Sequence, residues 1–124
     1  MKPLLPLELE FFSHFGIPAA EIPREPRNAC LKGRRLVQER SAAGTPLVLK
    51  PPFMGVMERI VQGREIPPHM RLAVRCVVRR FCIGVCEGNG GRFPVAEKNR
   101  ERCTKLIEEM TAQVGLQDRP VAVA

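Results

Sequence analysis

Four arginines in one apolar run form the pattern best suited to bind an anion in this sequence. Arg71, Arg75 and Arg79 recur at every fourth position, and Arg80 extends the series. On a helix such residues share one face, where like charges repel by about 0.2–0.5 kcal/mol per pair. A bound polyanion would relieve this repulsion, because guanidinium groups form paired hydrogen bonds with phosphate oxygens. The spacing therefore predicts phosphate contact. The alternative is pairing with acids of neighbouring helices, such as Glu58, Glu65 or Glu108.

The net charge of +7 is concentrated in two blocks of the sequence. Residues 27–45 and residues 66–92 carry +4 each, so Arg34 and Arg35 in the first block and His69 in the second are further candidates for phosphate contact. A basic face on a folded domain suits a nucleic acid, because phosphate contacts release counterions. The alternative is a face that only keeps the protein in solution. The sequence has six Phe but no Tyr or Trp, so an aromatic platform for stacking bases is not expected.

Cysteines offer a second, weaker chemistry. Cys76, Cys82, Cys86 and Cys103 could bind zinc or an iron–sulfur cluster, but five, three and sixteen residues separate them. Structural zinc sites use two tight pairs, and ferredoxin-type clusters use other spacings. We therefore expect buried thiols, with no metal and no cofactor.

No set of residues predicts an enzyme. His69 has no nucleophile at a supporting distance in the sequence, and His14, in an aromatic-rich helix, is expected to be half-buried. The glycines at 88, 90 and 91 lack the phosphate-loop pattern and predict a flexible turn.

The cysteine content and residues 1–20 indicate the cellular compartment of the protein. The number of cysteines is odd, and residues 1–20 contain acids and prolines where a signal peptide would have a basic and then an apolar region. We expect reduced thiols in the cytoplasm. No apolar stretch approaches the length of a membrane span, so no membrane is expected as a partner.

The elements that must position these residues are mainly helical. Apolar spacing with proline starts and glycine stops predicts an all-α bundle of about five short helices, joined by Pro/Gly-rich connectors. A single domain would cover residues 1–115, and residues 116–124 would be a flexible tail. The expected helices are residues 4–15, residues 28–43 with Asn28 as N-cap, residues 51–62 ended by Gly63, residues 70–86, and a last helix from Pro94 to Gly115. Residues 17–26 and 45–50 are expected to be extended.

Whether the arginines lie on one face depends on whether residues 70–86 form a helix or a strand. Its valines favour a strand, and Asn89-Gly90 is a hairpin signal. A helix, however, places the arginines on one face and an apolar stripe on another, whereas no face of a strand would be apolar. Periodicity therefore predicts a helix.

Part of the chain resembles a known family. Pro51-Pro52-Phe53-Met54, Met57-Glu58-Arg59, Gly63-Arg64-Glu65-Ile66-Pro67 and Arg71-Leu72-Ala73 resemble the helical C-terminal domain of the archaeal and eukaryotic primase large subunit. The resemblance spans residues 51–78. In that family the module is mainly helical, carries an iron–sulfur cluster, and helps to bind the template and the initiating nucleotide.

The resemblance implies nucleotide or phosphate contact for Arg71, with His69 as a shifted counterpart of the family's histidine. Phe53 occupies the position of the family's first cluster cysteine, Pro68 aligns with the histidine, and the later cysteine spacings differ. The ligands of a cluster are therefore not carried over.

The residue patterns leave three candidate functions. The first is a non-catalytic nucleic-acid-binding module that contacts the phosphate backbone of DNA or RNA, for example as an accessory domain in replication or primer synthesis. The second is a small helical subunit, surrounded by other protein subunits, that resembles those of CRISPR effector complexes. The third is a regulator that binds zinc or an iron–sulfur cluster through cysteines.

Overall fold

The computed structural model describes residues 3–115 and shows an all-α bundle, which confirms the predicted fold class. The only β-type pairing in this part of the chain is a single bridge. The predicted tail at 116–124 lies outside the described residues. The elements are α1 Pro6–Ser13, η1 Ala19–Glu21, α2 Pro26–Ala42, α3 Pro52–Gln62, η2 Pro68–Met70, α4 Arg71–Gly88 and α5 Glu97–Val114, where η1 and η2 are 3-10 turns.

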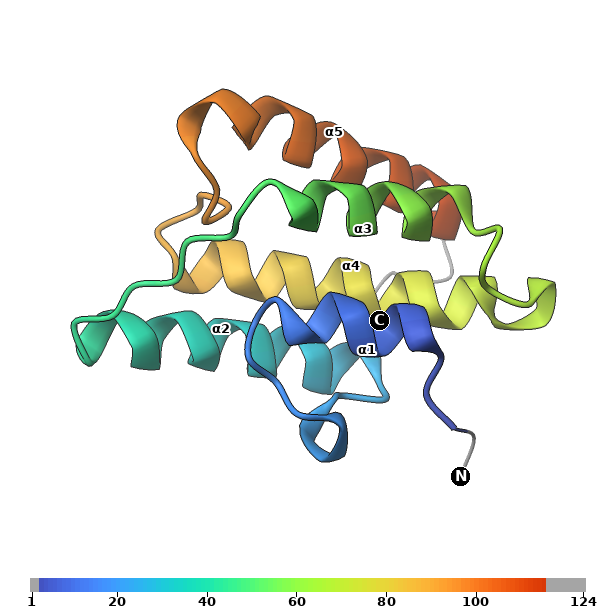
Figure 1. Cartoon of the computed structure of the whole chain (residues 1–124), viewed down its shortest axis with the longest axis horizontal. Helices are drawn as coiled ribbons and strands as arrows, with labels where there is room; N and C mark the ends of the chain where they lie inside the picture. Colours follow the sequence, from blue (N-terminus) through green and yellow to red (C-terminus); the bar gives the residue numbers. More distant parts are fainter. Residues whose placement is uncertain (1–2, 116–124) are drawn as a thin grey trace, which may run out of the picture.

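Helix α4 lies at the centre of the bundle (Figure 1). Helix α2 packs along one side of it and runs in the same direction, while α3 and α5 lie on the other side and run in the opposite direction. Helix α1 packs against α3. None of the helices within residues 3–115 combines the length and apolar character needed to cross a membrane.

The core is built around phenylalanine. All six phenylalanines of the chain are buried, at no more than 3% exposure. Their rings form one connected cluster, in which the Phe15 and Phe81 ring centres are 4.7 Å apart and Phe53 and Phe93 are stacked. Because each buried Phe stabilises the fold by roughly 1.5–3 kcal/mol, this cluster is where α1, α3 and α4 are joined. It also means that no phenylalanine is available to stack on a base.

The predicted helix over residues 70–86 is confirmed, and α4 extends two residues further, to Gly88. Asn89-Gly90 therefore follows a helix and forms no hairpin. Gly63 ends α3 with a left-handed φ of 72°, as expected for a glycine stop. Gly88, predicted to lie in the flexible turn, is instead the last residue of α4.

Helix α2 begins earlier than the sequence suggested. Asn28 was expected to cap it, but Glu25 is the N-cap and Pro26 occupies the first turn. Proline favours this position because its fixed φ suits a helix and its missing N–H would have no partner there. The preceding connector is also not fully extended, because residues 19–21 form η1.

Residues 45–50 are extended, as predicted. Their pairing also explains why α5 begins later than predicted. The Leu49 N–H donates a hydrogen bond to the Pro94 carbonyl at 2.8 Å, in a parallel bridge between Leu49 and Val95. This pairing keeps the segment around Pro94 extended. Helix α5 consequently begins at Glu97, and the predicted place of Pro94 in its first turn is wrong.

Glycines hold α2 against α4 at very short range. A Cβ atom added to Gly33 would lie 2.5 Å from the Phe81 carbonyl oxygen, and one added to Gly84 would lie 2.8 Å from the Cys30 carbonyl carbon. Gly88 meets the Arg34 backbone in the same way. Small residues four apart on facing helices allow such backbone contact. Gly33, which lowers helix propensity, is therefore present for packing.

Candidate nucleic-acid interface

Arg71 and Arg75 hydrogen bond to the carboxyl end of α3. The Arg71 Nε donates to the carbonyl oxygens of Gly63 and Ile66 at 2.9 and 3.1 Å. The Arg75 Nη2 donates to the Val61 carbonyl at 2.8 Å, and its Nε donates to the Ile60 carbonyl at 3.3 Å. The last carbonyls of a helix lack partners within the helix and carry partial negative charge, so two guanidinium groups stabilise this end.

This arrangement differs from the alternative of pairing with acids, because both arginines donate to carbonyl oxygens. They are half-buried against α3, so they do not lie on an open outer face. Two of the three acids proposed as partners are engaged elsewhere, since Glu65 pairs with Arg59 at 2.6 Å and Glu58 pairs with Arg102. Burial, and then repulsion from Arg71, lower the pKa of Arg75 from its ordinary value. The side chain nevertheless stays charged, as arginine does in proteins.

The remaining predicted residues of this block are spread over two sides of α4. The Arg79 Nε donates to the Thr111 Oγ1 at 2.8 Å, which directs it to α5. His69 is exposed in η2. Arg80 is half-buried close to the Cys30 thiol of α2. The structure therefore does not bring Arg71, Arg75, Arg79, Arg80 and His69 together as one surface.

Arginines of the first basic block do lie on an open surface. Helix α2 buries only three of its seventeen residues, Ala29, Gly33 and Val37; Gly33 and Val37 lie against α4, and Ala29 is one turn before Gly33 on the same face. The opposite side of α2 carries exposed residues at helical spacing, which we call the α2 outer face: Arg27, Asn28, Leu31, Arg35 and Gln38.

Two cations on this face have no partner of their own. Neither the Arg27 nor the Arg35 guanidinium forms an ion pair or hydrogen bond with any part of residues 3–115. Solvent and salt therefore surround both groups, and a phosphate could bind them without first breaking an ion pair.

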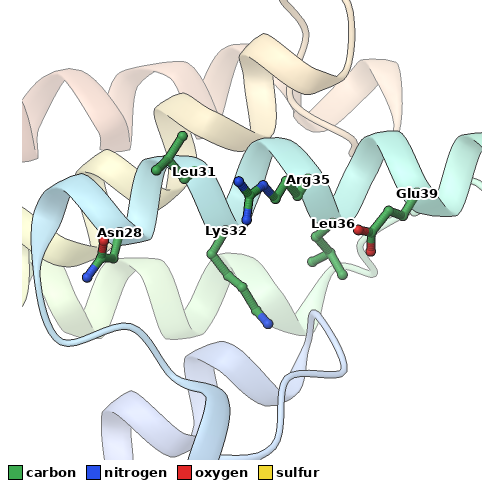
Figure 2. A pocket seen from close by; sticks show the side chains of 6 residues that line it. All are labelled: Asn28, Leu31, Lys32, Arg35, Leu36 and Glu39. Atoms are coloured by element: carbon green, nitrogen blue, oxygen red, sulfur yellow. The ribbon is translucent and has the colours of Figure 1, made fainter.

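A shallow hollow of about 330 Å³ follows the same helix. Figure 2 shows the six side chains around it, all of which come from α2. Two leucines, a lysine, an arginine, an asparagine and a glutamate line it. These residues are Asn28, Leu31, Lys32, Arg35, Leu36 and Glu39.

Ion pairs fix the two flanks of α2. Lys32 pairs with Glu21 of η1 at 3.4 Å, and Arg34 pairs with Glu87 of α4 at 2.9 Å. Burial raises the pKa of the Cys30 thiol, as does Glu87, whereas the charges of Arg34 and Arg80 act in the opposite direction. Arg34 and Arg80 thus border one flank of α2, next to the α2 outer face.

The cysteines are free thiols, and three of the four metal candidates, Cys76, Cys82 and Cys103, are buried. Burial raises the pKa of Cys82 well above its ordinary value, with smaller contributions from Cys86 and Cys103 nearby. Thiols of raised pKa are poor nucleophiles and poor metal ligands as they stand. Within residues 3–115, no three cysteine, histidine or acidic side chains are grouped closely enough to hold a metal ion.

Two residues with expected environments can be placed. His14 is half-buried, as predicted, with its ring edge-on to Phe53 at 5.7 Å between centres. Phe53, which the resemblance to the primase family would align with that family's first cluster cysteine, is completely buried in the phenylalanine cluster. This position therefore serves the core.

Arg27, Asn28 and Gln38 were not predicted from the sequence as residues of an exposed face. The signal was available, because Arg27, Leu31 and Arg35 recur every fourth residue opposite Gly33. This spacing was overlooked because α2 was predicted to start too late in the sequence, with Asn28 as its N-cap. No protein family, curated protein or solved structure matches the chain.

Proposed function

We propose that this protein is a non-catalytic nucleic-acid-binding module that contacts the phosphate backbone through α2. The observation that supports it best is the α2 outer face, where Arg27 and Arg35 are exposed without partners in residues 3–115. They belong to a helix on which five basic residues accompany a single acid. Phosphates are the ligands that such a row of cations suits, because each contact releases a counterion.

The predicted residues Arg34, Arg35 and Arg80 fit this surface, since they lie on the outer face or along its flank. Arg71 and Arg75 support the proposal less, because their hydrogen bonds already stabilise the end of α3. The contact would be mainly electrostatic, so binding should weaken steeply as salt is raised.

Charge reversal tests the proposal. We expect the double variant Arg27→Glu/Arg35→Glu to bind labelled DNA and RNA oligonucleotides at least about tenfold more weakly in fluorescence anisotropy. Because two phosphate contacts are lost, the slope of log K against log salt should fall by about 2. Both side chains are exposed, so circular dichroism should show an unchanged fold.

The matched control is Arg64→Glu/Lys98→Glu, which changes the net charge equally. Arg64 and Lys98 are also exposed and have no partner within residues 3–115, but they lie outside α2. We expect this control to lose about twofold at most. Equal losses in both variants would show that only net charge matters, and no binding by the wild type would refute the proposal.

A further inference from the structure

The α2 outer face belongs to a helix that can enter a groove. Seventeen residues give α2 a length of about 25 Å. Among the helices of residues 3–115, α4 is its main packing partner (Figure 1), and the residues of the α2 outer face are exposed. The major groove of B-form DNA is about 12 Å wide and admits one α-helix.

The side chains on this face can do more than neutralise phosphates. Asparagine or glutamine forms two hydrogen bonds with adenine at the base edge exposed in the major groove. Asn28 and Gln38 are exposed, and their side-chain amides have no hydrogen-bond partner in residues 3–115. Leu31, at 38% exposure, offers an apolar contact for a thymine methyl group.

The distances along the helix suit a short stretch of base pairs. Asn28 and Gln38 are ten residues apart, which is about 15 Å along the helix axis. This matches roughly four base pairs at 3.4 Å each. Arg35 lies between them on the same face.

The flanks of α2 provide a cation for each groove wall. Lys32 and Arg34 project about 200° apart around the helix, so they point to opposite sides of the outer face. Their ion pairs with Glu21 and Glu87 are at the surface and partly exposed to solvent. Such pairs contribute little stability, so phosphates can replace the carboxylates.

Other forms of nucleic acid fit less well. Single strands are usually bound by stacking bases on exposed aromatic rings, but the chain has no Tyr or Trp and buries every Phe. An RNA duplex has a deep, narrow major groove that side chains cannot reach.

We infer that the ligand is double-stranded DNA, with α2 lying in the major groove, where Asn28 and Gln38 contact base edges while Arg27 and Arg35 contact phosphates. This inference rests on the proposed function, and it adds the class of nucleic acid and the groove. It predicts a preference for particular sequences over about four base pairs, which backbone contact alone would not give.

Binding to matched probes tests the inference. The probes are a 20-base-pair DNA duplex, the RNA duplex of the same sequence, one DNA strand, and a DNA duplex with 7-deazapurines. The last probe removes the purine N7 acceptor from the major groove while every phosphate stays in place. At about 0.15 M salt, we expect the unmodified DNA duplex to bind about tenfold more tightly than any other probe.

A neutral variant separates base contact from charge. We expect Asn28→Ala/Gln38→Ala to lose the sequence preference that the wild type shows in selection from randomised duplexes, while its salt slope stays the same. Gln62→Ala, an exposed amide on α3, is the control and should keep the preference. Equal binding of all four probes that still depends on Arg27 and Arg35 would overturn the inference and leave the proposed function intact. No binding to any probe would overturn both.

Discussion

Replacing glycine by alanine should destabilise the protein at Gly84, where α2 and α4 are in contact, but stabilise it at Gly55 of α3. At Gly84, an added Cβ would overlap the Cys30 backbone oxygen and lie 2.8 Å from its carbonyl carbon and 3.0 Å from its Cα. These are backbone atoms, so no side-chain rotation can relieve the overlap. At Gly55 of α3, in contrast, an added Cβ would meet no atom within 4 Å.

Two opposing terms set the size of the effect. Alanine favours a helix over glycine by about 0.5–1 kcal/mol, which is the only term at the exposed Gly55. At Gly84 the overlap costs about 1–3 kcal/mol, and the upper part of this range applies because backbone must move. We therefore expect Gly84→Ala to lower the free energy of unfolding by about 2 kcal/mol, and Gly55→Ala to raise it by about 0.5–1 kcal/mol.

Chemical and thermal denaturation of the two variants measures both effects. At roughly 4 °C per kcal/mol, the Tm of Gly84→Ala should fall by about 8 °C, while that of Gly55→Ala should rise by a few degrees. If Gly84→Ala were as stable as the wild type, the backbones of α2 and α4 could not be in contact at Gly84. A loss of stability in Gly55→Ala would show that the propensity argument is wrong.

Two further predictions concern buried polar groups. Arg75→Met should lower the free energy of unfolding by about 1.5–3 kcal/mol in urea, because it removes charged hydrogen bonds to α3 carbonyls, whereas Arg64→Met should change it little. Equal effects would refute a capping role for Arg75. Burial raises the pKa of Cys103 from 9.0 to about 11. Between these two pH values the thiol ionises in the unfolded state before it does so in the folded state. The free energy of unfolding is therefore unaffected by this thiol below pH 9 and falls as the pH rises towards 11. The free energy of unfolding measured from pH 9 to 11 should fall less steeply in Cys103→Ala than in the wild type. Identical pH dependence in the two proteins would contradict this prediction.

The sequence was sufficient to predict that these segments are helices, because the type of each element depends on local signals. Apolar spacing identified α4 despite its valines, and Gly63 marked the end of α3 because it adopts the left-handed conformation that glycine favours. The start of α5 was missed for a non-local reason. The Leu49–Val95 bridge, between segments far apart in the sequence, holds Pro94 outside the helix.

The role of the arginine stripe could not be predicted from spacing alone. Helical periodicity placed Arg71 and Arg75 on one face, but it did not say which element would face them. That depends on where α3 ends in space, and its carbonyls accept their hydrogen bonds. A carbonyl partner is invisible in sequence because every residue has one, whereas the acids considered as partners are visible.

The way α2 is held also accounts for its open surface. A helix usually attaches to a core through a wide stripe of large apolar side chains. Helix α2 instead buries Ala29, Gly33 and Val37, because Gly84 and Gly88 of α4 let the two backbones approach closely. Dispersion contact is dense at such short range, so a narrow stripe is sufficient. The remaining circumference can then carry cations and amides, which a stripe of large side chains would have displaced. Packing by glycine and an open basic face are thus two consequences of one arrangement, and a substitution at Gly84 should disturb both.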